Sequence, residues 1–177
     1  VGVPAAGQAS AGLDGLVGHC VNMLPLRLRV ERGMPFPALV QASRGVMLDA
    51  YEHPEVTFGR VLQALPLARD PARLPLVSVV FNIDQALSGE ASAIPGLKLE
   101  LATNARRFET FELFVNAVDL GAAGMRLECQ YNADLFDAQT VSRWMAGFET
   151  LLRGAVADAG SAIDALPVLM PQDRQRI

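Results

Sequence analysis

The stretch VGHCVNMLPLRLRVE, residues 17–31, decides the fold, because it begins the clearest local pattern in the chain. From Leu24 to Glu31, every second residue is apolar, and the positions between hold Pro25 and then charged residues; this period of two predicts a half-buried β-strand. Two prolines follow, and apolar residues then recur at helical spacing, which predicts a helix over about 36–51. A strand that leads directly into a helix indicates a mixed α/β chain.

The rest of the chain continues this mixture of strands and helices. A shorter helix is predicted at 57–64, and an apolar, β-branched run at 76–83 is typical of a central strand buried on both faces. Asp137 is the predicted N-cap of a long amphipathic helix that ends near Gly160. A hairpin is predicted from two further alternating segments, at 110–119 and 125–131.

Three segments have the composition of loops or linkers. Residues 1–15 are small and predict a loop that enters the domain, 84–95 are polar, and 161–177 form a linker-like tail. Between the last two, alternating leucines predict one more strand at 97–101. Together these elements predict an α/β (α+β) sandwich, in which a mixed β-sheet has helices packed on one face.

Length, charge and cysteine content exclude several classes of protein. A chain of 177 residues fits one domain and can bury a core. The net charge of −4 gives no footprint for nucleic acid or an anionic membrane, and no apolar run approaches the ~20 residues of a membrane span. Cys20 and Cys129 lack C-x-x-C spacing, so we expect neither a disulfide framework nor a metal site. We expect both thiols to be reduced, in the cytoplasm.

Three motifs, in order along the chain, resemble those of non-ribosomal peptide synthetase condensation domains. Residues 17–27 resemble VGxFVNTLPLR, residues 52–60 resemble a diverged HQDVPFE segment, and residues 69–76 resemble RDxSRNPL. Two later stretches also resemble the family, YNADLFD at 131–137 and LPVLMPQDR at 166–174. All of these belong to the second half of such a domain. The family's HHxxxDG motif, with its catalytic histidine, belongs to the first half, and no His-His pair occurs in this sequence.

The resemblance implies a specific architecture. Residues 1–160 would form the C-terminal lobe of a condensation domain, similar to one chloramphenicol acetyltransferase subunit. Residues 84–105 would be a latch-like crossover segment that joins the other lobe, and 161–177 a linker towards the next domain. Because the chain starts at Val1 without Met, we expect it to be part of a longer protein.

The resemblance also implies a function in bacterial secondary-metabolite or antibiotic biosynthesis. The parent enzyme would join a carrier-bound donor acyl thioester to an acceptor amine and so form an amide bond. No cofactor would bind directly, since the substrates are held on phosphopantetheine arms of carrier proteins. The expected partners are the N-terminal lobe, the carrier proteins and neighbouring synthetase domains. This lobe would supply one wall of the substrate tunnel and part of the carrier docking surface, and alone it should be inactive.

Five residues are candidates for the substrate channel. Asn22 lies between apolar neighbours, and a buried Asn must be hydrogen-bonded, so we favour a role in satisfying backbone groups over one in lining the channel. Arg69, Asp70 and Arg73 lie on a Pro-rich loop, which guanidinium–carboxylate bonds could lock. Their alternative role is electrostatic, near the substrate or at a phosphopantetheine phosphate. His19 could shape the channel.

Other polar residues favour simpler interpretations. Adjacent His19 and Cys20 side chains would point to opposite faces of a strand, which disfavours a nucleophile–base pair. His53 is expected at the surface. Solvated or loop-facing positions are expected for three carboxylates, Glu109, Glu112 and Asp119. The sequence contains no GxSxG motif, Gly-rich phosphate loop or metal-ligand cluster.

Alternative functions remain open. The Val-Asn-x-Leu-Pro-Leu-Arg form at 21–27 favours amide formation, whereas the divergence at 19–20 and 52–60 leaves an ester-forming or polyketide-hybrid domain open. A coenzyme A-dependent acyltransferase of the same superfamily is a second alternative. A non-catalytic lobe that binds carriers or a partner protein is a third.

Overall fold

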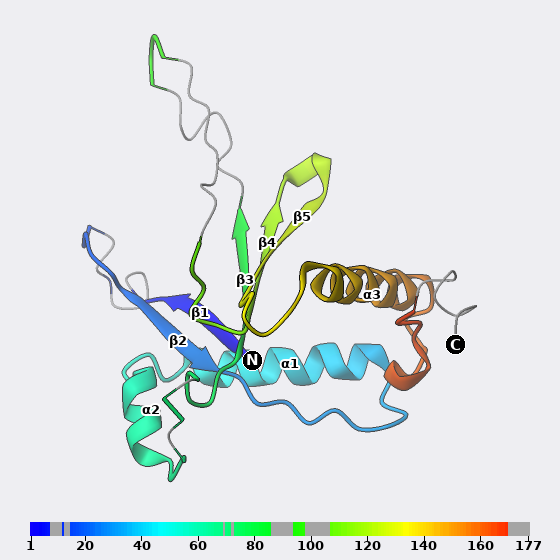
Figure 1. The fold of residues 1–177 in the computed structure, drawn as a ribbon, viewed down its shortest axis with the longest axis horizontal. Coiled ribbons are helices and arrows are strands. Elements are labelled where there is room, and N and C mark those ends of the chain that lie inside the picture. The colour runs from blue at the N-terminus through cyan, green and yellow to red at the C-terminus, as the bar shows by residue number, and fades with distance from the viewer. Residues whose placement is uncertain are drawn as a thin grey trace. The chain divides into compact units, whose positions relative to one another are not determined.

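The computed structural model describes residues 1–7, 12, 15–68, 70–71, 73–85, 94–97 and 107–169 (Figure 1). The elements are, in order, β1 (Gly2–Ala6), β2 (Val21–Pro25), α1 (Phe36–Tyr51), α2 (Phe58–Ala64), β3 (Val79–Gln85), β4 (Leu113–Asp119), η2 (Gly121–Ala123), β5 (Met125–Tyr131), α3 (Ala138–Ala157) and η3 (Ile163–Ala165). They fall into two compact units, one with all five strands and α2, the other with α1, α3 and η3. The expected mixed α/β class is confirmed.

The five strands form one mixed sheet in the order β2-β1-β3-β4-β5. β1 is antiparallel to β2 and parallel to β3, β3 is parallel to β4, and β4 and β5 form the predicted antiparallel hairpin. Because side chains alternate between the faces of a sheet, the register places Asn82, Asn116 and Glu128 side by side on one face. Ile83, Ala117 and Leu127 lie side by side on the other.

Two expectations near the N-terminus are wrong. Residues 1–15 were expected to form a loop, but Gly2–Ala6 form β1 at the inside of the sheet. Gly2 fits there because a Cβ at this position would lie only 2.6 Å from a Val77 methyl carbon and 2.7 Å from the Met23 sulfur. The strand expected from Leu24 to Glu31 is instead Val21–Pro25. β2 is an edge strand, where a proline without an N–H can end the pairing.

The central strand begins later than expected and is less buried. β3 starts at Val79, and Leu76 cannot belong to it because its φ of 71° is a left-handed conformation that a strand does not allow. Val77 and Val80 are the largest fully buried side chains, but Ile83 is 63% exposed. The expected burial on both faces is therefore wrong, since within β3 Val80 is buried but Val79 and Phe81 are only half-buried.

The long helices agree closely with their periodicity. α1 spans Phe36–Tyr51 as predicted, and α3 spans Ala138–Ala157, a few residues short of the expected end. The Asp137 carboxylate accepts a hydrogen bond of 2.7 Å from the Thr140 N–H, which confirms the N-cap. None of the described helices is long and apolar enough to cross a membrane.

Some predicted segments lie outside the described residues. Of the proposed latch at 84–105, Asp84 and Gln85 end β3, while 86–93 and 98–105 are not described. The strand predicted at 97–101 and the tail beyond 169 also lie mostly outside the described ranges.

Candidate functional site

Asn22 connects β2 to α2 within the first unit. Its Oδ1 accepts hydrogen bonds from the Met23 N–H at 3.0 Å and the Phe58 N–H at 3.1 Å. Phe58 is the first residue of α2, and the first N–H groups of a helix have no partner inside it. Asn22 therefore caps α2 from a neighbouring strand, which confirms that it satisfies backbone groups. The same bonds join the motif at 17–27 to the one at 52–60.

A cavity of about 740 Å³ lies between α2 and the Pro-rich loop that follows it. This volume is within the range of small-molecule sites. The lining is mostly apolar, with a carboxylate and a guanidinium from the motif at 69–76: Gly59, Leu62, Gln63, Leu65, Leu67, Asp70, Pro71, Arg73 and Pro75. The fold thus places two of the candidate residues, Asp70 and Arg73, at one cavity beside the helix that Asn22 caps.

The Pro-rich loop is attached to the sheet through Arg73. The Arg73 Nε lies 3.6 Å from the Glu112 Oε1, just before β4, so the carboxylate that this arginine contacts is Glu112. The Glu112 Oε1 is buried and has no hydrogen-bond partner among the described residues, so the ion pair is its nearest compensation. Because the Arg73 side chain is 61% exposed, the pair should contribute at most about 1 kcal/mol. Arg69 lies outside the described residues.

The remaining channel candidate, His19, does not belong to this cavity. It is exposed, precedes β2, and is not among the lining residues. Its neighbour Cys20 also precedes the strand, and the Cys20 carbonyl accepts a hydrogen bond of 3.0 Å from the Gly7 N–H. The other thiol, Cys129 in β5, has its pKa raised by burial, which makes it a poorer nucleophile.

The other carboxylates serve the local backbone. The Glu109 Oε1 accepts bonds from the N–H groups of Thr110 and Phe111, at 2.8 and 3.2 Å, and Asp119 accepts one of 2.8 Å from the Gly121 N–H. These contacts confirm loop-facing positions. His53 is 70% exposed, as expected, with its Nδ1 3.6 Å from the Glu55 carboxylate. In the described part of the chain, no three His, Cys, Asp or Glu side chains come together to hold a metal.

A polar network between β3 and β4 is not predicted by the local sequence patterns. Asn116 is 9% exposed, and its Oδ1 accepts a bond of 3.0 Å from the Asn82 Nδ2. Its Nδ2 donates one of 3.0 Å to the Asp84 carboxylate. A buried amide that is paired at both ends fixes the register of the parallel strands. The only signal in the sequence is that polar residues occupy alternate positions of an otherwise apolar strand.

Comparison with known proteins identifies relatives along the whole chain. The family model described as the condensation domain matches residues 1–177. A probable non-canonical nonribosomal peptide synthetase, CymA, of Salinispora arenicola is 32% identical over 182 residues. The match covers 100% of this chain and only 2% of that protein. The chain therefore spans a small part of this curated relative.

Solved structures share the fold at lower identity. The X-domain from teicoplanin biosynthesis is 19% identical with a TM-score of 0.82, and the match covers 95% of this chain and 39% of that one. AB3403, a four-domain nonribosomal peptide synthetase, is 17% identical with a TM-score of 0.85, and the match covers 98% of this chain and 14% of that one.

Proposed function

Because this chain belongs to the condensation-domain family, we propose that it is the C-terminal lobe of a peptide-synthetase condensation domain. The motifs at 17–27 and 69–76 support this assignment, since they resemble second-half motifs. A further support is that the chain matches 39% of the X-domain chain, as expected for one lobe of two. The complete domain would act in the cytoplasm, with substrates held on phosphopantetheine arms.

The proposed reaction is amide bond formation between two carrier-bound groups. The acceptor amine attacks the donor thioester carbonyl, the C–N bond forms, and the C–S bond breaks. The amine loses a proton, and the released pantetheine sulfur takes one up. Catalysis of this kind depends mainly on positioning and on stabilising charge at the tetrahedral centre. The histidine for this step would come from the other lobe, because His19 and His53 are exposed and neither lines the cavity.

The observation that carries this proposal is the cavity of about 740 Å³ beside Asp70 and Arg73. We assign it to the tunnel wall, with Arg73 directed by Glu112 and available to a phosphate or carbonyl oxygen of the arm. Asn22 would not contact the substrate. It would hold α2, the opposite wall of the cavity, in place through its bond to the Phe58 N–H. The coenzyme A-dependent and ester-forming alternatives would use the same cavity.

The test is condensation by the two-lobed protein with Arg73→Gln. The substitution removes the exposed cation that would contact the phosphopantetheine arm. It should raise KM for the carrier-bound donor about fivefold, corresponding to about 1 kcal/mol, and leave KM for a short N-acetylcysteamine thioester unchanged. Arg153→Gln is the matched control, because Arg153 is exposed on α3 and pairs with Glu149. Equal effects on both donors would assign Arg73 to loop stability alone.

A non-catalytic docking lobe is the second candidate. The X-domain from teicoplanin biosynthesis, which shares this fold, has been solved in complex with OxyB. If the two-lobed protein binds loaded carriers but forms no amide, the docking function is supported instead.

A further inference from the structure

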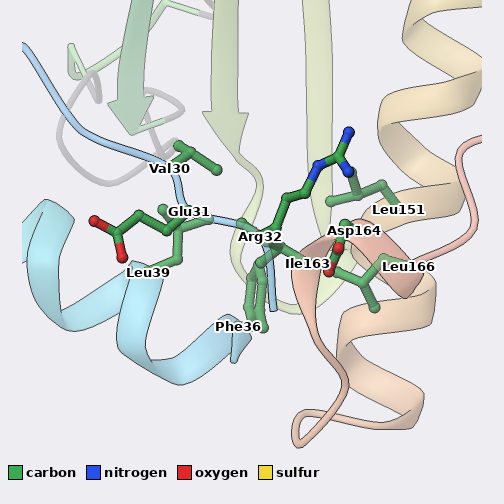
Figure 2. Close-up of a pocket in the computed structure, with 9 residues that line it drawn as sticks. All are labelled: Val30, Glu31, Arg32, Phe36, Leu39, Leu151, Ile163, Asp164 and Leu166. Atoms are coloured by element: carbon green, nitrogen blue, oxygen red, sulfur yellow. The ribbon is translucent and has the colours of Figure 1, made fainter. Parts of the chain in front are cut away.

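The second unit contains a separate cavity of about 320 Å³ beside the N-terminal end of α1. This volume is at the lower end of the range for small-molecule sites. Six apolar side chains line it, Val30, Phe36, Leu39, Leu151, Ile163 and Leu166. Three charged ones complete the lining, Glu31, Arg32 and Asp164 (Figure 2). An apolar interior with a few charges is the usual composition of a ligand pocket.

Hydrogen bonds join the two segments that carry the charged lining residues, 30–36 and 161–166. We call this charged side of the pocket its mouth. The Asp164 Oδ1 accepts a bond of 3.1 Å from the Gly33 N–H. The Ile163 N–H donates to the Met34 carbonyl at 2.9 Å, and the Phe36 N–H donates to the Ser161 carbonyl at 3.2 Å. These bonds fix the two segments relative to each other, which lowers the entropic cost of binding.

The charges at the mouth are not paired with one another. No carboxylate of the described residues lies within 4.0 Å of the Arg32 guanidinium. In Figure 2 the Arg32 side chain extends toward Leu151, whereas Glu31 extends to the opposite side, beside Leu39. Asp164 comes from the other segment of the mouth. The lining thus holds one cation, Arg32, and two anions, of which Glu31 extends away from Arg32 and Asp164 lies on the other segment.

We propose that this pocket binds a free α-amino acid with a bulky apolar side chain, of the leucine or phenylalanine class. The side chain would fill the apolar interior. The α-carboxylate would pair with Arg32, and the α-ammonium with Asp164 Oδ2, while Oδ1 keeps its bond to Gly33. A simple carboxylate would meet the negative charge of Asp164, and a simple amine would meet Arg32, so the mouth favours a zwitterion over either. This binding is independent of amide formation.

The test is calorimetric titration of the 177-residue chain with L-phenylalanine, N-acetyl-L-phenylalanine and L-phenylalaninamide. The acetyl compound lacks the ammonium group and the amide lacks the carboxylate. Each should bind about two- to fivefold more weakly than the free amino acid, as expected for losing one exposed ion pair.

Two variants assign each ionic contact. Arg32→Gln should abolish the preference for the free amino acid over its amide. Asp164→Asn keeps an oxygen acceptor for the Gly33 N–H and should abolish the preference over the acetyl compound. Arg44→Gln is the control, since Arg44 is exposed on α1 and does not line the pocket. The proposal is overturned if L-phenylalanine shows no saturable binding, if the blocked compounds bind equally well, or if the preferences persist in both variants.

Discussion

Gly154 in α3 should be required for the docking of the segment that follows the helix. A Cβ at Gly154 would lie 2.6 Å from the Pro167 Cδ and 2.8 Å from its Cγ, closer than real Cβ atoms approach another carbon. Gly147, seven residues earlier and on the same side of the helix, would place a Cβ 3.0 Å from the Val168 carbonyl oxygen. The two glycines therefore form a groove in α3 that accommodates residues 167–168.

Gly154→Ala should destabilise the protein by about 1–2 kcal/mol. Inserting a methyl group into a filled contact costs about 1–3 kcal/mol, and the rigid proline ring cannot turn away. The higher helix propensity of Ala returns up to about 1 kcal/mol. Gly45→Ala is the matched control, because Gly45 is in α1 and, apart from its chain neighbours and the backbone of its own helix, no described atom lies within 4 Å of its Cβ position. That change should stabilise by about 0.5–1 kcal/mol.

Thermal unfolding followed by circular dichroism measures both effects. For a chain of this size, 1 kcal/mol corresponds to about 2–4 °C, so Gly154→Ala should lower Tm by roughly 2–8 °C, while Gly45→Ala should raise it slightly. Hydrogen exchange should also speed up at residues 163–169 in Gly154→Ala alone. If both variants raise Tm to the same extent, the segment does not dock on α3 as the structure places it.

Three further changes test other contacts. Asn22→Leu leaves the first N–H of α2 unpaired and should lower the free energy of unfolding by about 1–2 kcal/mol in urea denaturation, whereas Asn22→Asp, which keeps an acceptor, should lose less. Asn116→Asp places a second carboxylate beside Asp84, so its deficit in Tm relative to the wild type should shrink as pH falls and the pair takes up a proton. The backbone N–H of Thr140 holds the pKa of Asp137 below its usual 3.8. The cap therefore stabilises α3 fully above the pKa of Asp137 in the unfolded chain, and this stabilisation is lost as pH falls through its pKa in the folded protein. Asp137→Asn should remove this part of the acid dependence of Tm.

Local periodicity is sufficient to predict the bounds of an element that is regular along its whole length. The spacing in α1 and the alternation in β5 predicted Phe36–Tyr51 and Met125–Tyr131, and both are correct. β1 could not be predicted because its residues are small, and it is a strand only through pairing with β2 and β3. Pro25 ended β2, although the alternation continued beyond it.

The sequence predicts individual residues of the candidate site but not the contacts that bring them together. Asn22, Asp70 and Arg73 could be selected by type, and Asn22 could be assigned to backbone bonding. Its partner Phe58 lies 36 residues away, and no local pattern reports a contact of that kind. The same holds for the cavity between α2 and the Pro-rich loop, and for the partnership of Arg73 with Glu112.

We propose that these residues are one half of an active site. The most direct test is intact-protein mass spectrometry of amide formation between loaded donor and acceptor carriers. It compares the 177-residue chain with the same residues joined to a condensation half that carries HHxxxDG. We expect product from the joined protein only, and its loss when the second histidine of that motif is replaced by alanine. Product from the 177 residues alone would contradict the account and would assign the chemistry to residues within this chain.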